Sequence, residues 1–387
     1  MEIPNEGLSF QPPFRIFNLG GGVGCLSAEN SACWLLVPTE DMLVWSDISG
    51  LRVPYEILEL GPLQPITESY FSNIEDLNDP ISNVCLSARS GDDQALDVAQ
   101  AQRWKGLALA YRNRGDGKKA TRAERIGAQI IFATNTLHKL VYAYKNTMIS
   151  QLRESQICDF SCGTFNFYSN KYAMDIGYRT QSCLNELFGL RDFIFYFLFD
   201  DLYGESIRLS KAENFLQNND KFGLADVIIP HIRQQAPIGK LALMSLYRNV
   251  FFHYVGPNFG PLGQSYCFRE WSGKGWRIPY IVYPLYDNVE SLKRLEKGES
   301  LWDPNSSAEK EDAMRFMQLE RHIDALNFCH ESFLTLLRIS QAIEECIELE
   351  SEVQKITEDD IISATMEHSD GSTTRVRRNE SGKLENY

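Results

Sequence analysis

The spacing of apolar residues changes near residue 92. Before it, short apolar runs such as "FRIFNL" and "CWLLVP" are separated by Gly, Pro and Asp, which is typical of short strands. After it the spacing is helical, and a first helix is predicted to end at the Gly-Asp-Gly of residues 115–117. The pattern predicts an acidic, strand-rich region over 1–100 and a helical region over 101–356.

Four stretches of the helical region carry apolar residues at steps of three and four. They cover about 119–156, 180–206, 238–255 and 307–355. In the first stretch the stripe consists of Ile126, Ile130, Ala133, Leu137, Leu140, Val141, Tyr144 and Met148. Such stripes are stable only when they are buried against one another, so we expect a helical bundle.

Two segments of the chain have β-hairpin character. Residues 258–290 include aromatic-rich runs on either side of Ser-Gly-Lys-Gly, which predicts a hairpin inserted between helices. Residues 357–387 form a polar C-terminal tail in which "SATMEHSDGSTTRVRR" suggests an exposed hairpin.

Charge is distributed unevenly along a chain whose net charge is -14. Residues 1–100 hold 3 Lys/Arg against 15 Asp/Glu, whereas residues 101–154 hold 11 Lys/Arg against 3 Asp/Glu. The net charge argues against a surface built throughout for nucleic acid, but a local basic segment can attract phosphate groups. That segment could equally dock on the acidic N-terminal region or form a solvated helix face.

The strongest candidates for phosphate binding lie around the predicted helix break. They are Arg112, Arg114, Lys118, Lys119 and Arg122. We interpret them as substrate-binding candidates, with a solvated loop and helix start as the alternative. If the acidic N-terminal region covers them, it holds the site closed until a partner displaces it.

Several features of the sequence limit the class of protein to which the chain can belong. The nine cysteines are odd in number and irregularly spaced, which indicates reduced thiols rather than a disulfide framework. The pair in "CDFSC" lacks further ligands at zinc-like spacing, so no metal or other cofactor is expected. No signal peptide or membrane-spanning run is evident, and we expect a soluble, cytoplasmic protein without membrane contact. The glycines of "FNLGGGVGC" lack a following Gly-Lys-Ser/Thr, which favours a tight turn over a nucleotide loop.

The stretch "LMSLYRNVFFHYVGP", residues 243–257, holds the candidate chemistry. Asn249 and His253 are four apart and lie on nearly the same helix face, while the long Arg248 side chain can swing towards them. The Gly-Pro stop places His253 in the last turn, where the helix dipole favours imidazolium. An arginine, an amide and a titrating histidine suit a phosphate and a proton transfer. Ion-paired or surface residues are the alternative interpretation.

The "RNVFFH" motif resembles the Arg-polar-three-residues-His signature of the HEPN superfamily, the higher-eukaryote and prokaryote nucleotide-binding domains. The resemblance covers the order of helices over roughly 119–355. It implies a mainly α-helical, HEPN-like bundle, here with an N-terminal α+β region and a β-hairpin insertion. Many members of that superfamily are metal-independent endoribonucleases whose motifs pair across a homodimer.

The resemblance also implies roles for individual residues. Arg248 and His253 become the catalytic pair, and Asn249 the polar member of the motif. An acidic residue on the second helix often faces the motif, and Glu186 is the candidate. Tyr254 is a candidate substrate contact; in members modified on a tyrosine, that residue stands one position later.

The expected function is therefore RNA cleavage through attack by the 2′-OH, in a toxin or antiviral effector that acts as a homodimer with a composite site. An antitoxin or a regulatory protein would be its partner. The alternative is a non-catalytic HEPN-like module that binds nucleotide or a partner protein. A third interpretation is an unrelated helical scaffold in which the motif is accidental.

Overall fold

The computed structural model describes the helical region most fully. It describes residues 14–27, 33–38, 43–47, 65–71, 87–88, 96–154, 166–168, 171–253, 266–273, 276–285, 289–297, 323–347, 363–367, 373–378 and 384–386. Within these ranges the protein is mainly helical, with eight α-helices and a set of short strands.

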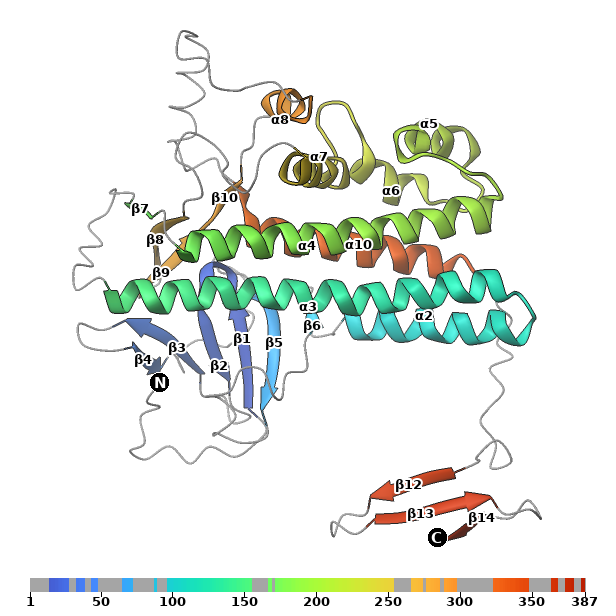
Figure 1. The fold of residues 1–387 in the computed structure, drawn as a ribbon, viewed down its shortest axis with the longest axis horizontal. Helices are drawn as coiled ribbons and strands as arrows, with labels where there is room; N and C mark the ends of the chain where they lie inside the picture. The colour runs from blue at the N-terminus through green and yellow to red at the C-terminus, as the bar shows by residue number, and fades with distance from the viewer. Residues whose placement is uncertain are drawn as a thin grey trace.

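Two long helices, α3 (Gly117–Glu154) and α4 (Lys171–Tyr196), lie side by side along the molecule (Figure 1). They are antiparallel, because residues early in α3 contact residues late in α4. The sequence predicted a helix over 119–156, and every member of its apolar stripe is at most 1% exposed. The second helix begins at Lys171, earlier than predicted, because the buried Ala173 and Ile176 extend its packed face.

A hairpin of helices forms one end of the bundle. Helix α2 (Leu96–Asn113) packs against α3, and the chain reverses at Gly115, which has a φ of 79°. Asp116 caps the start of α3 by accepting a hydrogen bond from the Lys119 backbone N–H at 3.1 Å. The helix end predicted at residues 115–117 is thereby confirmed.

Helix α10 (Ala325–Glu345) packs against α4, α3 and α2, and its residues include much of the core. The prediction of one continuous helix over 307–355 is wrong at its start, because Ile323–Asp324 form strand β11, which pairs with β10 (Pro284–Leu285). The partly buried Asp324 carboxylate caps α10 at Asn327 and also accepts from the Tyr144 hydroxyl at 2.8 Å. This capping residue ends the strand and starts the helix.

The N-terminal strands form a six-stranded antiparallel sheet beside α3 (Figure 1). Its order is β4 (Leu43–Asp47), β3 (Cys33–Pro38), β2 (Gly24–Ser27), β1 (Phe14–Leu19), β5 (Pro65–Phe71) and β6 (Ser87–Ala88).

The glycine run forms the 3₁₀ turn η1 (Gly20–Gly22) between β1 and β2, as the tight-turn interpretation predicted. A Cβ on Gly22 would lie 2.7 Å from the Tyr144 carbonyl oxygen, so glycine permits the sheet to approach α3 closely.

Two smaller antiparallel sheets complete the described strands. Strands β8 (Tyr266–Gly273) and β9 (Trp276–Val282) form the predicted hairpin with Gly273 opposite Trp276, and β7 (Asn166–Tyr168) joins its edge. The predicted C-terminal tail contains a meander of β12 (Ser363–Glu367), β13 (Thr373–Arg378) and β14 (Leu384–Asn386).

The remaining helices lie beyond α4 as seen from α3 (Figure 1). The π-helical turn η4 (Phe197–Tyr203) extends α4, followed by α5 (Leu209–Asn219) and α6 (Ala225–Ile232). Helix α7 (Lys240–His253) packs on α4, and α8 (Val289–Glu296) packs on α7. Within the described ranges, no helix is long and apolar enough to cross a membrane.

Candidate functional site

The Arg-polar-three-residues-His motif lies in the C-terminal half of α7. Arg248 and Asn249 are partly buried, and His253 is the last helical residue. The side chain of His253 and all of Tyr254 lie outside the described residues. The motif is thus at the predicted place on its helix. The described part of the site consists of Arg248, Asn249 and the residues that contact them.

Two arginines from different helices share one aromatic ring. The Arg248 guanidinium carbon lies 4.6 Å from the centroid of Phe188 on α4, and that of Arg191 lies 3.7 Å from the same centroid. Both distances are within the range of cation–π contacts. The ring thereby holds two positive groups close together, at the point where α7 crosses α4.

Arg191 is the more deeply buried of the two arginines, with only 5% of the residue exposed. Its guanidinium donates to the Asp192 carboxylate from Nε at 3.0 Å and from Nη2 at 2.6 Å, and Nη1 donates to the Ser245 hydroxyl. Burial lowers the pKa of Arg191; Asp192 opposes that shift and the neighbouring Arg248 adds to it. The site therefore holds two arginines close together in a partly desolvated place, with the carboxylate of Asp192 balancing the charge of Arg191.

Asn249 connects Arg248 to helix α8. Its amide oxygen accepts from Arg248 Nη1 at 3.2 Å, and its Nδ2 donates to the Glu296 carboxylate at 2.7 Å. An amide in this position has a fixed orientation, because the carboxylate can accept and the guanidinium can only donate. Glu296 therefore orients Asn249, which in turn orients Arg248.

Glu296 was not predicted from the sequence, which favoured Glu186 as the acidic residue that faces the motif. Glu186 accepts from Gln129 Nε2 on α3 at 2.6 Å, so its carboxylate faces α3. On α4 it is Phe188 and Arg191 that face the motif helix. The acidic orienting contact on Asn249 comes from α8, 47 residues beyond it in sequence.

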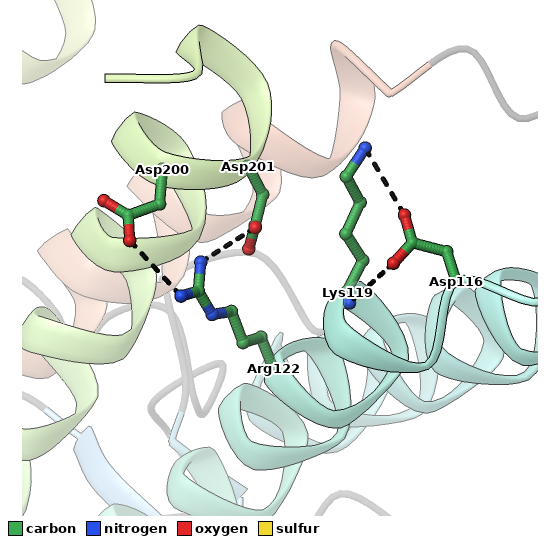
Figure 2. A network of polar contacts seen from close by, with 5 residues as sticks. All are labelled: Asp116, Lys119, Arg122, Asp200 and Asp201. Atoms are coloured by element: carbon green, nitrogen blue, oxygen red, sulfur yellow. Dashed lines mark hydrogen bonds and ion pairs between the residues drawn. The ribbon is translucent and has the colours of Figure 1, made fainter. Parts of the chain in front are cut away.

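The basic segment at the α2–α3 turn is separate from this site. Figure 2 shows Arg122 between two consecutive aspartates of η4, with Nη1 2.8 Å from Asp201 and Nη2 3.2 Å from Asp200. Burial disfavours its charge, but the two carboxylates outweigh that effect and raise the pKa of Arg122. The guanidinium also lies over the Tyr196 ring. Arg122 thus ties the start of α3 to the end of α4.

Other members of the predicted phosphate-binding set also have carboxylate neighbours. Arg112 pairs with Glu124 at 2.9 Å on the surface, and Lys119 pairs with Asp116 at 3.7 Å (Figure 2). Arg114 and Lys118 are exposed. These residues lie near α3, whereas Arg248 lies on the other side of α4 (Figure 1). The structure does not bring the basic segment and the motif together.

The described N-terminal strands also lie away from the basic segment. Gly22 approaches α3 at Tyr144, roughly 30 Å along the helix from the basic residues near its start, at 1.5 Å per residue. Helix α2 covers α3 near that start. The idea that the acidic region shields the basic segment has no support from the strands that the structure describes.

The chain matches no family model, no curated protein and no solved structure. Its chemistry must be argued from the site itself. The two guanidinium groups that share Phe188 can donate hydrogen bonds to an anion such as a phosphodiester and stabilise added negative charge on it.

Proposed function

We propose that the protein is a metal-independent endoribonuclease with a HEPN-like helical bundle. The observation that carries this proposal is the contact of two guanidinium groups with Phe188, one from Arg191 on α4 and one from Arg248 in the half of α7 that ends at His253. A phosphate approaching Arg248 would meet a partly buried guanidinium whose charge is weakly screened by water. The resemblance of "RNVFFH" to the superfamily's motif supports the same reaction.

In the proposed reaction, the 2′-oxygen of RNA attacks the adjacent phosphorus and the bond to the 5′-oxygen breaks. The products are a 2′,3′-cyclic phosphate and a free 5′-hydroxyl, with no metal required. His253 transfers a proton at the attacking or leaving oxygen, and Arg248 stabilises the charge on the crowded phosphorus. RNA alone carries the attacking hydroxyl.

The protein would act as a homodimer, in which a second His253 supplies the opposite proton transfer. The biological role we propose is that of a toxin or antiviral effector, held in check by an antitoxin or regulatory protein. Arg112, Arg114, Lys118, Lys119 and Arg122 remain candidates for distant backbone contacts. Arg122 could take that role only by exchanging its aspartates for phosphate.

Cleavage of total RNA in EDTA by wild type and by His253→Ala tests the proposal. Wild type should cut, and His253→Ala should lose at least about 10²-fold in rate, because a general acid or base contributes that much. Circular dichroism establishes that the variant is folded. Lys293→Ala on the exposed face of α8 is the control, and it should cut like wild type.

Equal cutting by wild type and His253→Ala would place the activity elsewhere. If neither cuts, binding of a labelled oligonucleotide by wild type and Arg248→Ala distinguishes a non-catalytic binding module from an accidental motif. Arg191 and Arg248 together can hold a phosphate without any proton transfer, so the binding alternative predicts weaker binding by Arg248→Ala.

A further inference from the structure

A stripe of mixed apolar and polar side chains runs along the outer face of α4. Met174, Tyr178 and Tyr196 are 62%, 60% and 56% exposed. With Asn185 and Asp192 they follow steps of four and seven residues, which place all five on one face of the helix. The rings of Tyr178 and Tyr196 each contact an arginine, Arg179 and Arg122, yet both residues remain more than half exposed.

The stripe borders the candidate site. Asp192 belongs to the stripe and holds Arg191, whose ring neighbour Phe188 contacts Arg248. On the side of α3, Phe132 adds a further exposed ring, with 56% exposure, one turn from Gln129, which bonds to α4. The stripe is therefore continuous with the motif and widened by an apolar edge.

The order of residues along the stripe is symmetric about Asn185. Tyr178 and Asp192 each lie seven residues from it, and Met174 and Tyr196 each lie eleven residues from it. If a second α4 crosses in the antiparallel direction with a two-fold axis at Asn185, Met174 meets Tyr196 of the second copy. Tyr178 then meets Asp192 of the second copy, and each of these contacts occurs twice.

The chemistry of the paired positions is favourable. A methionine sulfur packs well on an aromatic ring, and a tyrosine hydroxyl donates to a carboxylate. Lys171 at the N-terminal end of α4 would approach Asp200 just beyond the C-terminal end of the other α4, where Asp200 already pairs with Arg122 of its own copy. Near the axis, Ser182, Asn185 and Gly189 are short, which allows two helices to come within roughly 8–10 Å.

We propose that this stripe is the surface on which a second copy of the chain docks. A nucleic acid is the less suitable occupant, because Asp192 lies within the stripe and Asp200 and Asp201 lie at its end. A self-complementary stripe needs no separate partner.

The catalytic meaning of this interface rests on the proposed function. Phe188 is three residues from the axis, so the two Phe188–Arg248 clusters would lie about 9 Å apart along the paired helices. Two such clusters could act on one RNA strand. The interface itself can be tested without RNA, so it can stand where the nuclease proposal fails.

Sedimentation velocity of Tyr178→Glu and Tyr178→Lys tests the proposal. Both variants lose the same ring, but the glutamate would face Asp192 of the second copy and the lysine would pair with it. We expect a dimeric wild type, a dimer Kd at least about tenfold higher for Tyr178→Glu, and a Kd near that of wild type for Tyr178→Lys. Leu109→Glu, on exposed α2, should leave the Kd unchanged.

A monomeric wild type at micromolar concentration overturns the proposal. So does a wild-type dimer that Tyr178→Glu leaves intact, since the interface would then lie elsewhere. Asn185→Cys gives a second test. A cysteine on the two-fold axis should form a disulfide with the same cysteine of the second copy under mild oxidation. Mass spectrometry should find the peptide containing position 185 linked to itself, and its absence from a dimeric variant contradicts the placement of the axis.

Discussion

The two arginine clusters use similar groups in opposite ways. Arg122 lies over Tyr196 and pairs directly with two carboxylates, whereas Arg248 lies over Phe188 together with a second guanidinium and donates to a neutral amide. Burial disfavours the charge of both Arg122 and Arg191. Two carboxylates outweigh burial at Arg122 and raise its pKa, whereas the single carboxylate of Asp192 does not outweigh it at Arg191, whose pKa is lowered with a small addition from Arg248. The first arrangement joins helices, and the second is suited to an incoming anion.

Cleavage by Arg248→Ala should show the largest effect. Removing a donor that stabilises transition-state charge costs about 10²–10³-fold in rate, and we expect a loss of that size in a single-turnover assay. Arg248→Lys should not restore cutting, since an ammonium lacks the planar group that stacks on Phe188. Lys293→Ala is the matched loss of charge; a comparable loss there would make the effect one of general electrostatics.

Stability should respond most to the other cluster. Arg122→Ala leaves Asp201, whose side chain is 3% exposed, without its ion-pair partner, and we expect a loss of about 3 kcal/mol in the free energy of unfolding in urea. Arg112→Ala breaks an ion pair whose members are both 56% exposed and should change little. If Arg122→Ala is as stable as wild type but loses cleavage, the roles of the two clusters are reversed.

His138, a buried histidine that belongs to neither arginine cluster, makes the stability of the protein depend on pH. Burial lowers the pKa of His138 to about 3, and its ring nitrogens have no hydrogen-bond partner among the residues that the structure describes. Below pH 6.5 the unfolded chain binds a proton that the folded chain does not, so His138 lowers stability as pH falls. His138→Phe should therefore gain about 2 kcal/mol more at pH 5 than at pH 8.

Asp324 changes stability with pH in the direction opposite to His138. Burial raises its pKa to about 6, so its contribution is present at low pH and is lost as pH rises through 6. Asp324→Asn should flatten that dependence, as thermal unfolding at pH 5 and pH 8 can show. If both variants keep the wild-type pH dependence of stability, other groups control that dependence. These two variants then cannot separate the effect of unfolding from the pH profile of cleavage.

Breaking the hydrogen bonds that link Arg248, Asn249 and Glu296 should give the smallest effect on cleavage. In Glu296→Lys the introduced ammonium can only donate, so the Asn249 amide turns and presents Nδ2 to Arg248. We expect about a tenfold loss of cleavage, equivalent to one ordinary hydrogen bond to a charged group. Adding Asn249→Asp should restore the rate, because a carboxylate accepts from both neighbours. Failure of the double variant to recover would show that Asn249 contributes more than orientation.

Local patterns predicted much of the fold. The apolar stripe of α3, the helix stop at Gly115 and the two-residue hairpin turn after Gly273 each depend on neighbouring residues. The start of α10 was missed because Asp324 ends the preceding strand through contacts with Tyr144 and the Tyr283 backbone, far away in sequence. Such a cap is decided by tertiary packing.

The candidate site was predictable only in part. The motif names Arg248 and Asn249, but the choice between Glu186 and Arg191 depends on how α4 is rotated against α7. The second half of α4 is apolar nearly all round, so its pattern does not reveal that rotation. Glu296 carried no signal, since its role arises only where α8 packs on α7.

The most direct test of the central claim is cleavage of one defined RNA strand in EDTA, with and without the 2′-oxygen at the cut position. We predict that wild type cuts the natural strand, leaves 2′,3′-cyclic phosphate and 5′-hydroxyl ends, and spares the 2′-deoxy strand. Arg248→Ala should cut neither strand, while Lys293→Ala, on the exposed face of α8, should cut like wild type. Cleavage of the 2′-deoxy strand, or undiminished cleavage by Arg248→Ala, would contradict the account.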